Sequence, residues 1–295
     1  MLIANPIYDV FFKYLLEDNE IAREFIGTII GEEIVELTLQ PQESTLQIET
    51  FSFTVLRMDF HAVIQTKEGK KNVLIEMQKG KYLDDLSRFR KYLGEQYSKD
   101  ENKLPIITIY FLGYPLDDKL PAATHIQRDY VNMFTGEKLQ VKNSFVESLT
   151  HDSYLIQIPL LKENVQSKLE ALLSIFDQTK KASEAYILSF PDTLPKVELL
   201  QKIIKRLQQA GTTEELRKKA QIENEVETSF KKMAREIQEK DQAIQDKDQT
   251  IQEKDQTIQE KDQAIQEKDQ TMLEQAKALQ EQERIIAELK QKLNQ

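Results

Sequence analysis

The stretch that decides the fold covers residues 53–80 and reads FTVLRMDFHAVIQTKEGKKNVLIEMQKG. Side chains in residues 56–64 and again in 73–78 alternate between two faces, which is the pattern of β-strands. Between them, Thr66-Lys67-Glu68-Gly69 is a turn signal. The stretch therefore predicts a β-hairpin.

This hairpin brings two acidic side chains together. A turn centred between residues 67 and 68 places Asp59 opposite Glu76, and a turn one residue later pairs Asp59 with Gln78. Facing carboxylates repel unless a cation lies between them. Mg²⁺ is the natural cation for such an oxygen site, and its chemistry suits phosphodiester hydrolysis. The alternative, slightly favoured by spacing alone, is a solvated strand edge with the acids paired to Arg57 or Lys79.

The flanking segments predict helices on either side of a sheet. Apolar residues recur at helical spacing up to Gly31, with a break near Asp18, and again around residues 82–97. Residues 104–112 (LPIITIYFL) are a nearly continuous apolar run, typical of a central strand covered on both faces. This order of elements predicts an α/β fold with a mixed sheet flanked by helices.

The C-terminal part is a heptad repeat. Five near-identical heptads of the IQEKDQA type begin at Ile237. The apolar residue that opens each heptad recurs every seven residues as far as Leu293. Such a stripe predicts a coiled coil, weakened in its middle because Lys fills the second core position. Gly211 and the capping box Thr212-x-x-Glu215 mark its expected start. We expect self-association; the alternative is a single solvated helix or a largely disordered tail.

Composition limits the chemistry. The 295 residues carry a net charge of −10, include no Cys, and have only three scattered His. Thiolate nucleophiles and Cys-based metal sites are excluded, so any metal site must be built mainly from oxygen ligands. No apolar run is long enough to span a bilayer and no signal peptide is evident, so we expect a cytoplasmic protein without a membrane partner. Residues 67–103 are locally basic.

These features together resemble a known family. Asp9-Val-Phe-Phe-Lys13, Arg57-x-Asp59, Ile75-Glu76-Met77-Gln78 and Arg88 with Tyr92 are similar to the PD-(D/E)xK nuclease superfamily, and within it to the transposase-like, recombination-promoting Rpn nucleases. The resemblance covers about residues 3–162 and implies a restriction-endonuclease-like fold.

The resemblance also implies roles for individual residues. Asp59 and Glu76 would be the ligands of Mg²⁺, with Mn²⁺ as an alternative, and Asp9 would be an accessory acid near the metal. Gln78 takes the place of the superfamily's Lys but carries no charge. Lys79 points to the opposite face of a regular strand, so Lys13 is the preferred substitute cation.

The resulting hypothesis is a metal-dependent DNA endonuclease acting in recombination, transposition or defence. It has a nuclease-like domain (1–162), a helical connector (163–210) and a coiled coil (212–295) that makes a homo-oligomer. The residues expected to contact DNA are basic: Arg57, Lys79, Lys81, Arg88, Arg90 and Lys91. The alternative, suggested by the uncharged Gln78 and the acidic total, is a catalytically degenerate nuclease fold that serves as a coiled-coil scaffold or DNA-binding interaction protein.

Overall fold

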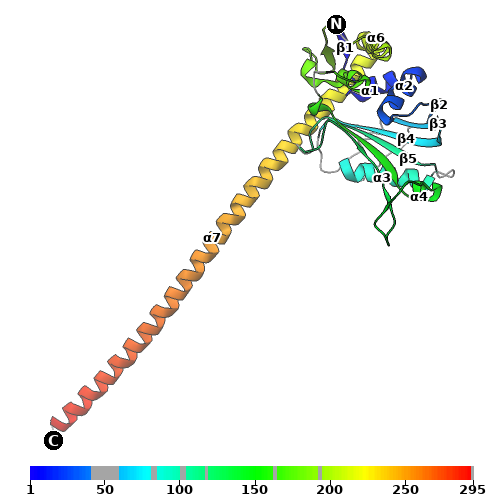
Figure 1. Cartoon of the computed structure of the whole chain (residues 1–295). Coiled ribbons are helices and arrows are strands. Elements are labelled where there is room, and N and C mark those ends of the chain that lie inside the picture. Colours follow the sequence, from blue (N-terminus) through cyan, green and yellow to red (C-terminus); the bar gives the residue numbers. More distant parts are fainter. Residues whose placement is uncertain are drawn as a thin grey trace. The chain divides into compact units, whose positions relative to one another are not determined.

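The computed structural model describes residues 1–40, 60–80, 85–99, 104–116, 119–161, 165–191 and 195–293 (Figure 1). Its strands are β1 (Leu2–Ala4), β2 (Glu36–Leu39), β3 (Phe60–Thr66), β4 (Gly69–Gln78), β5 (Ile106–Leu112), β6 (Ala123–Ile126), β7 (Tyr130–Val131), β8 (Lys138–Leu139), β9 (His151–Gln157) and β10 (Ile187–Ser189). Its α-helices are α1 (Asp9–Leu16), α2 (Asn19–Ile30), α3 (Asp85–Lys99), α4 (Ser144–Leu149), α5 (Lys168–Leu173), α6 (Glu198–Thr212) and α7 (Glu214–Leu293). Short 3-10 turns are η1 (Ile158–Leu160), η2 (Ser174–Phe176) and η3 (Gln178–Lys180).

Within the described ranges, six strands form one mixed sheet in the order β2-β3-β4-β5-β9-β6. The central strands β4, β5 and β9 are parallel, and β3 and β6 flank them antiparallel. The edge strand β2 pairs antiparallel with β3. The predicted α/β fold, a mixed sheet flanked by helices, is confirmed. The hairpin pairs Phe60 with Ile75 and Thr66 with Gly69, which is the register of a turn centred between residues 67 and 68.

The N-terminal helices begin and end at local signals. Asp18 caps α2 by accepting hydrogen bonds from the backbone N–H groups of Glu20 and Ile21, at 3.1 and 3.2 Å. Gly31 ends the same helix with φ of 73°, a left-handed conformation that favours glycine. The break predicted near Asp18 therefore separates α1 from α2.

One face of the sheet carries the apolar core. Alternate residues of the four inner strands β3, β4, β5 and β9 pack against α1, α2, α5 and α6 in one cluster of buried side chains. At its centre Phe111 contacts the rings of Phe12 and Phe176, with ring centroids 5.8 and 4.8 Å apart. Figure 1 shows α1 and α2 on one side of the sheet and α3 on the other. The ring of Phe89 on α3 meets Tyr110 of β5 at 4.4 Å, so the second face is covered as predicted for a central strand.

The predicted connector is part of this packed unit. The helices α5 and α6 share the core cluster, and β10 pairs with β1 at the start of the chain. By contact density the compact unit extends from Met1 to Val226, and a second unit begins at Glu227. The domain boundary predicted at Gly211 therefore lies within the compact unit. The first turns of α7 still pack against the core of this unit, where Ala220 is fully buried.

The capping box expected at Thr212 does not form. Thr212 belongs to the last turn of α6, where its hydroxyl donates to the carbonyl of Gln209 at 2.9 Å. The chain turns at Thr213, and α7 begins at Glu214. The cause is that α6 continues through Gly211, whose backbone packs against Ala4 of β1.

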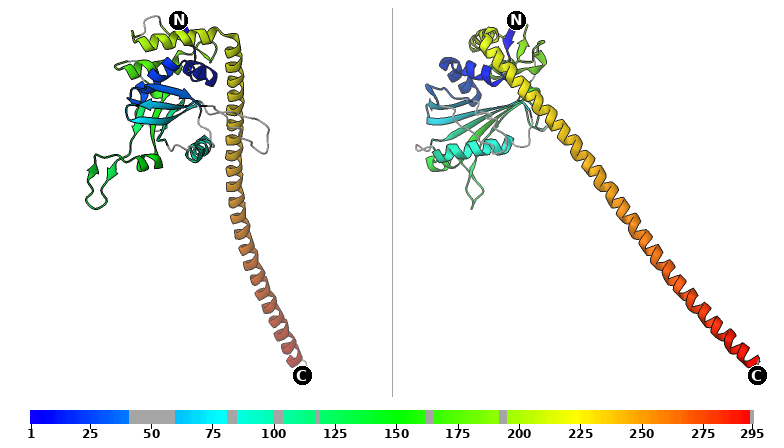
Figure 2. Two further views of the ribbon diagram at one scale, coloured as in Figure 1. Left: turned by 90° about the vertical axis from the view of Figure 1, so that its right-hand side faces the viewer. Right: turned by 180° about the vertical axis from the view of Figure 1, so that it is seen from behind.

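The second unit is the remaining part of α7, a single helix in every view (Figures 1 and 2). The whole helix has 80 residues and a length of about 120 Å. The repeat isoleucines are each about half exposed; they are Ile237, Ile244, Ile251, Ile258 and Ile265. The long C-terminal helix is confirmed, and its pairing into a coiled coil stays a prediction. Among the described residues, none of the helices combines the length and apolar character needed to cross a membrane.

Candidate functional site

The second face of the sheet carries Glu76 and Gln78 near the end of β4. Alternation along the strand places them opposite Val73, Ile75 and Met77, which belong to the apolar core. Glu76 is 3% exposed and Gln78 is 8% exposed. Because β4 and β5 are parallel, their carboxyl ends lie at the same edge of the sheet. The predicted acid and its amide neighbour therefore lie together on a buried face, close to that edge.

This face is unusually polar for a buried surface. His61, Asn72, Thr108 and Gln157 share it, and each is 9% exposed or less. His61 lies 3.4 Å from the Asn72 side chain, and Thr108 donates to the Ser153 hydroxyl at 2.8 Å. Buried polar groups cost free energy unless they are hydrogen-bonded, so a polar interior is more informative about function than an apolar one.

Several contacts fix the end of β4. The Tyr114 hydroxyl donates to Oε1 of Gln78 at 3.1 Å, and the Gly113 N–H donates to the Gln78 carbonyl at 2.7 Å. A Cβ atom at Gly113 would lie 2.5 Å from the carbonyl oxygen of Lys79, so this close approach requires glycine. The side chain of Gln78 is therefore held in a defined orientation.

Tyr110 is a neighbour of Glu76 that the sequence interpretation missed. Burial raises the pKa of Tyr110 well above its usual range, and the charge of Glu76 adds to this effect, while a hydrogen bond with Thr108 opposes it. Tyr110 therefore keeps its proton and presents a hydrogen-bond donor on the polar face. The signal was available: Thr108 and Tyr110 are the polar positions at alternate places within the apolar run LPIITIYFL.

Lys79, predicted to contact DNA, is engaged within the chain. It forms an ion pair with Glu223 of α7, and both side chains are mostly buried, at 13% and 17% exposed. Its Nζ also lies 3.4 Å from the centroid of the Tyr8 ring, a cation–π contact on the apolar side of the sheet. A phosphate contact by Lys79 would require the carboxylate of Glu223 to give way.

Asp9 and Lys13 form the pair that their spacing predicts. Nζ of Lys13 donates to Oδ2 of Asp9 at 2.8 Å, with both side chains 30% exposed. Oδ1 of Asp9 is buried and has no hydrogen-bond partner within the described part of the chain. The Asp9 N–H donates to Oε1 of Glu223 at 3.1 Å. The structure thus joins Asp9 with Lys13 and, through Glu223, with Lys79.

The remaining predicted residues are placed only in part. Arg57, Asp59 and Lys81 lie outside the described residues. Arg88, Arg90 and Lys91 lie in α3. The side chain of Arg90 is exposed to solvent. Their predicted roles in metal and DNA binding stay predictions.

The donor chemistry available on the polar face fits a hard divalent cation. Glu76 supplies a carboxylate and Gln78 a neutral amide oxygen, the ligand types that Mg²⁺ and Mn²⁺ accept. Within the described ranges, which exclude Asp59, no group of three or more His, Cys, Asp or Glu side chains is placed to hold a metal. Glu76, with Asp59 as the predicted second ligand, would hold the ion.

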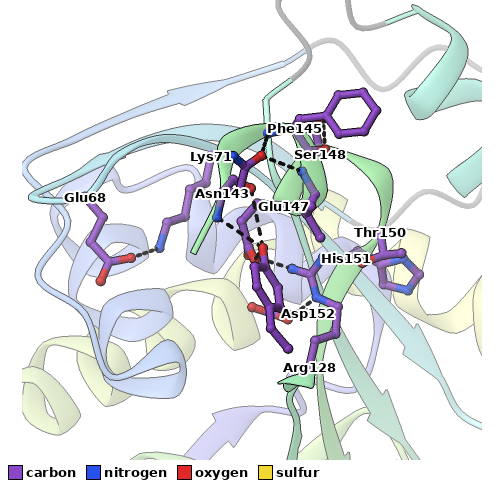
Figure 3. A network of polar contacts seen from close by, with 12 residues as sticks. Glu68, Lys71, Arg128, Asn143, Phe145, Glu147, Ser148, Thr150, His151 and Asp152 are labelled. Carbon is purple, nitrogen blue, oxygen red and sulfur yellow. Dashed lines mark hydrogen bonds and ion pairs between the residues drawn. The ribbon is translucent and has the colours of Figure 1, made fainter. Parts of the chain in front are cut away.

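A second polar region, which the sequence analysis did not single out, lies at the opposite edge of the sheet. Arg128 is held between Glu147, at 2.9 Å, and Asp152, at 3.1 Å (Figure 3). A cavity of about 810 Å³ borders this network and reaches the start of β5 at Pro105. The hydroxyl of Tyr130, at the base of the β7–β8 hairpin, donates a hydrogen bond to Glu147. This network anchors the hairpin and α4 to β9.

The fold and these contacts define a mixed α/β protein with a polar, acid-bearing face on its central parallel strands. Compared with known proteins, the chain matches no family model, no curated protein and no solved structure. The resemblance to the Rpn nucleases therefore stays a prediction, carried by the residues themselves.

Proposed function

We propose that the protein is a metal-dependent endonuclease that hydrolyses phosphodiester bonds, with DNA as the substrate and a role in recombination, transposition or defence. The observation that carries the proposal is the buried carboxylate of Glu76 on the polar face of the central strand, with Gln78 two residues later and held in place by Tyr114. A buried acid at this place in a mixed sheet suits a cation-binding role better than a surface ion pair.

Each side chain has a definite part in this proposal. Glu76 and the predicted ligand Asp59 hold a divalent cation, which when bound neutralises phosphate charge and lowers the pKa of an attacking water. Gln78 orients that water by a hydrogen bond, and its amide supplies no charge. Tyr110, the neighbour of Glu76 on β5, would donate a hydrogen bond to a phosphate oxygen on the same face. Exposed Arg90 on α3 is available to the DNA backbone.

The test is cleavage by the purified full-length protein. Supercoiled DNA, linear DNA and single-stranded RNA are incubated with and without Mg²⁺, and products are resolved on gels. We expect DNA nicking or cleavage only with metal, and no cleavage by Asp59→Ala, Glu76→Ala or Glu76→Gln.

Glu76→Gln preserves the size of the buried side chain, so its loss of activity separates chemistry from misfolding. The matched control is Glu36→Ala, which removes an exposed acid from β2 of the same sheet and should leave cleavage unchanged. Full activity in the Asp59 or Glu76 variants would show that the metal ligands are misassigned. Salt-dependent DNA retention without any product would instead favour a DNA-binding protein with a degenerate site.

A further inference from the structure

The first turns of α7 contact the same elements that carry the predicted site. One carboxylate oxygen, Oε1 of Glu223, accepts the backbone N–H of Asp9 at 3.1 Å and forms the ion pair with Lys79. Asn224, the next residue, accepts a hydrogen bond from the Tyr8 hydroxyl at 2.7 Å. Two consecutive residues of α7 are therefore bonded to the start of α1 and to the residue that follows Gln78.

These contacts are partly buried, and one side of the helical segment that makes them packs against the core. Ala220, one turn before Glu223, is fully buried in the core cluster. Arg217 anchors the same helix to Glu184 through two hydrogen bonds of 2.9 and 3.0 Å. One side of segment 217–224 is thus packed against the globular unit, and this packing places the carboxylate of Glu223 beside the start of α1.

The position of Glu223 suits a structural anion. The first N–H groups of a helix lack partners within the helix and favour negative charge, and the ammonium of Lys79 lies at the same point. A single carboxylate satisfies both groups and so joins two segments that are separated by some 70 residues of sequence. Removing the carboxylate of Glu223 would break both its hydrogen bond with the Asp9 N–H and its ion pair with Lys79.

We propose that Glu223 is a positioning residue for the predicted site, and that the start of the C-terminal helix completes that site. Glu223 fixes the N-terminus of α1, which carries Asp9, relative to the end of β4, where Lys79 directly follows Gln78. The inference rests on the proposed nuclease function for its catalytic meaning. The positioning itself is a property of the chain that can be measured without activity.

The experiment compares full-length wild type with Glu223→Ala and Glu223→Gln. Amide hydrogen exchange is followed by mass spectrometry in peptides covering the start of α1 and the end of β4. Cleavage of DNA with Mg²⁺ is measured in parallel to obtain kcat and KM. The matched control is Glu215→Ala, which removes an exposed ion pair with Lys219 from the same helix.

We expect Glu223→Ala to speed exchange several-fold in both segments. Glu223→Gln should protect the start of α1, because its amide oxygen still accepts the Asp9 N–H, yet loosen the end of β4, because the charge on Lys79 loses its partner. In cleavage, Glu223→Ala should lower kcat by about 10- to 100-fold with KM within about twofold, as expected for misplaced catalytic groups. Glu215→Ala should change neither readout.

Unchanged exchange at both segments in Glu223→Ala would overturn the proposal. An increase in kcat would also overturn it, because Glu223 would then restrain the site rather than position it. If Glu223→Ala does not fold, Glu223→Gln provides the test. Faster exchange at the end of β4 with protection kept at the start of α1 would support the proposal, and unchanged exchange in both segments would overturn it. If wild type does not cleave, the proposed function fails, while the exchange data still decide whether Glu223 joins the two segments.

Discussion

The boundary of the folded unit leads to a quantitative prediction about truncation. A chain ending at Val226 keeps the contacts of α7 with the core, whereas a chain ending at Thr213 loses them. The shorter chain deprives Lys79 of the carboxylate of Glu223. Breaking a buried pair from one side costs about 3–5 kcal/mol, which is an upper bound here because removing the helix also opens Lys79 to solvent. Loss of the hydrogen bond between Tyr8 and Asn224 adds about 1 kcal/mol.

Further losses are smaller. The buried methyl group of Ala220 contributes about 0.8 kcal/mol, and the partly exposed pair of Arg217 with Glu184 contributes at most about 1 kcal/mol. Removing segment 214–226 should therefore cost up to about 5 kcal/mol. For a domain of this size each kcal/mol lowers the melting temperature by about 2–4 °C, so the expected drop is at most about 10–20 °C.

The assay is thermal unfolding by circular dichroism and calorimetry of the two truncated proteins beside the full chain. The near-ultraviolet signals of the three proteins should be compared. The far-ultraviolet signal is less suitable, because removing residues 227–295 takes away helix whether or not the packed unit is destabilised. The protein ending at Val226 should melt at the same temperature as the packed unit of the full chain. Equal melting temperatures for the two truncated proteins would refute the assignment of the first turns of α7 to the folded unit.

Three other measurements test separate parts of the structure. Phe111→Ala, at the centre of the aromatic cluster, should lower the free energy of unfolding by about 3–5 kcal/mol in urea titrations, whereas Phe134→Ala, at a position 99% exposed, should change it by less than about 0.5 kcal/mol; equal effects would contradict the placement of the core. Burial, with the charge of Arg128, lowers the pKa of His151 from 6.5, so the unfolded state binds a proton more readily and stability falls as pH drops below that value. His151→Gln should flatten the dependence of melting temperature on pH in that range, and an unchanged slope would be inconsistent with this. Sedimentation equilibrium should give a mass of two or more chains for the full-length protein and of one chain after truncation at Val226; a monomeric full-length protein would rule out the coiled coil.

Much of the sheet could be predicted because strand signals are local. The alternation and turn chemistry around Gly69 specify the hairpin, and the apolar run of residues 104–112, which contains all of β5, specifies a strand covered on both faces. The packing of the predicted connector was harder to predict from the sequence. Its strand β10 is only three residues long, and its partner β1 lies at the start of the chain, far away in sequence. A short strand of this kind has no repeating pattern, and only its partner defines it.

The candidate site divides in the same way. Alternation along β4 places Glu76 and Gln78 on one face and predicts Lys79 on the other, which the contact of Lys79 with Tyr8 confirms. The depth of burial of Glu76 and the hydrogen bond from Tyr114 to Gln78 could not be predicted, because both depend on segments that are brought together only by folding.

The sequence by itself determined the two-part organisation that periodicity encodes: a sheet-forming unit followed by a long helix with a heptad stripe. Periods of two and seven are properties of neighbouring residues, so they can be read along the chain. Only the tertiary structure decided where the first part ends and what Lys79 contacts. The ion pair with Glu223 joins residues 144 positions apart, and no local pattern specifies a contact at that separation.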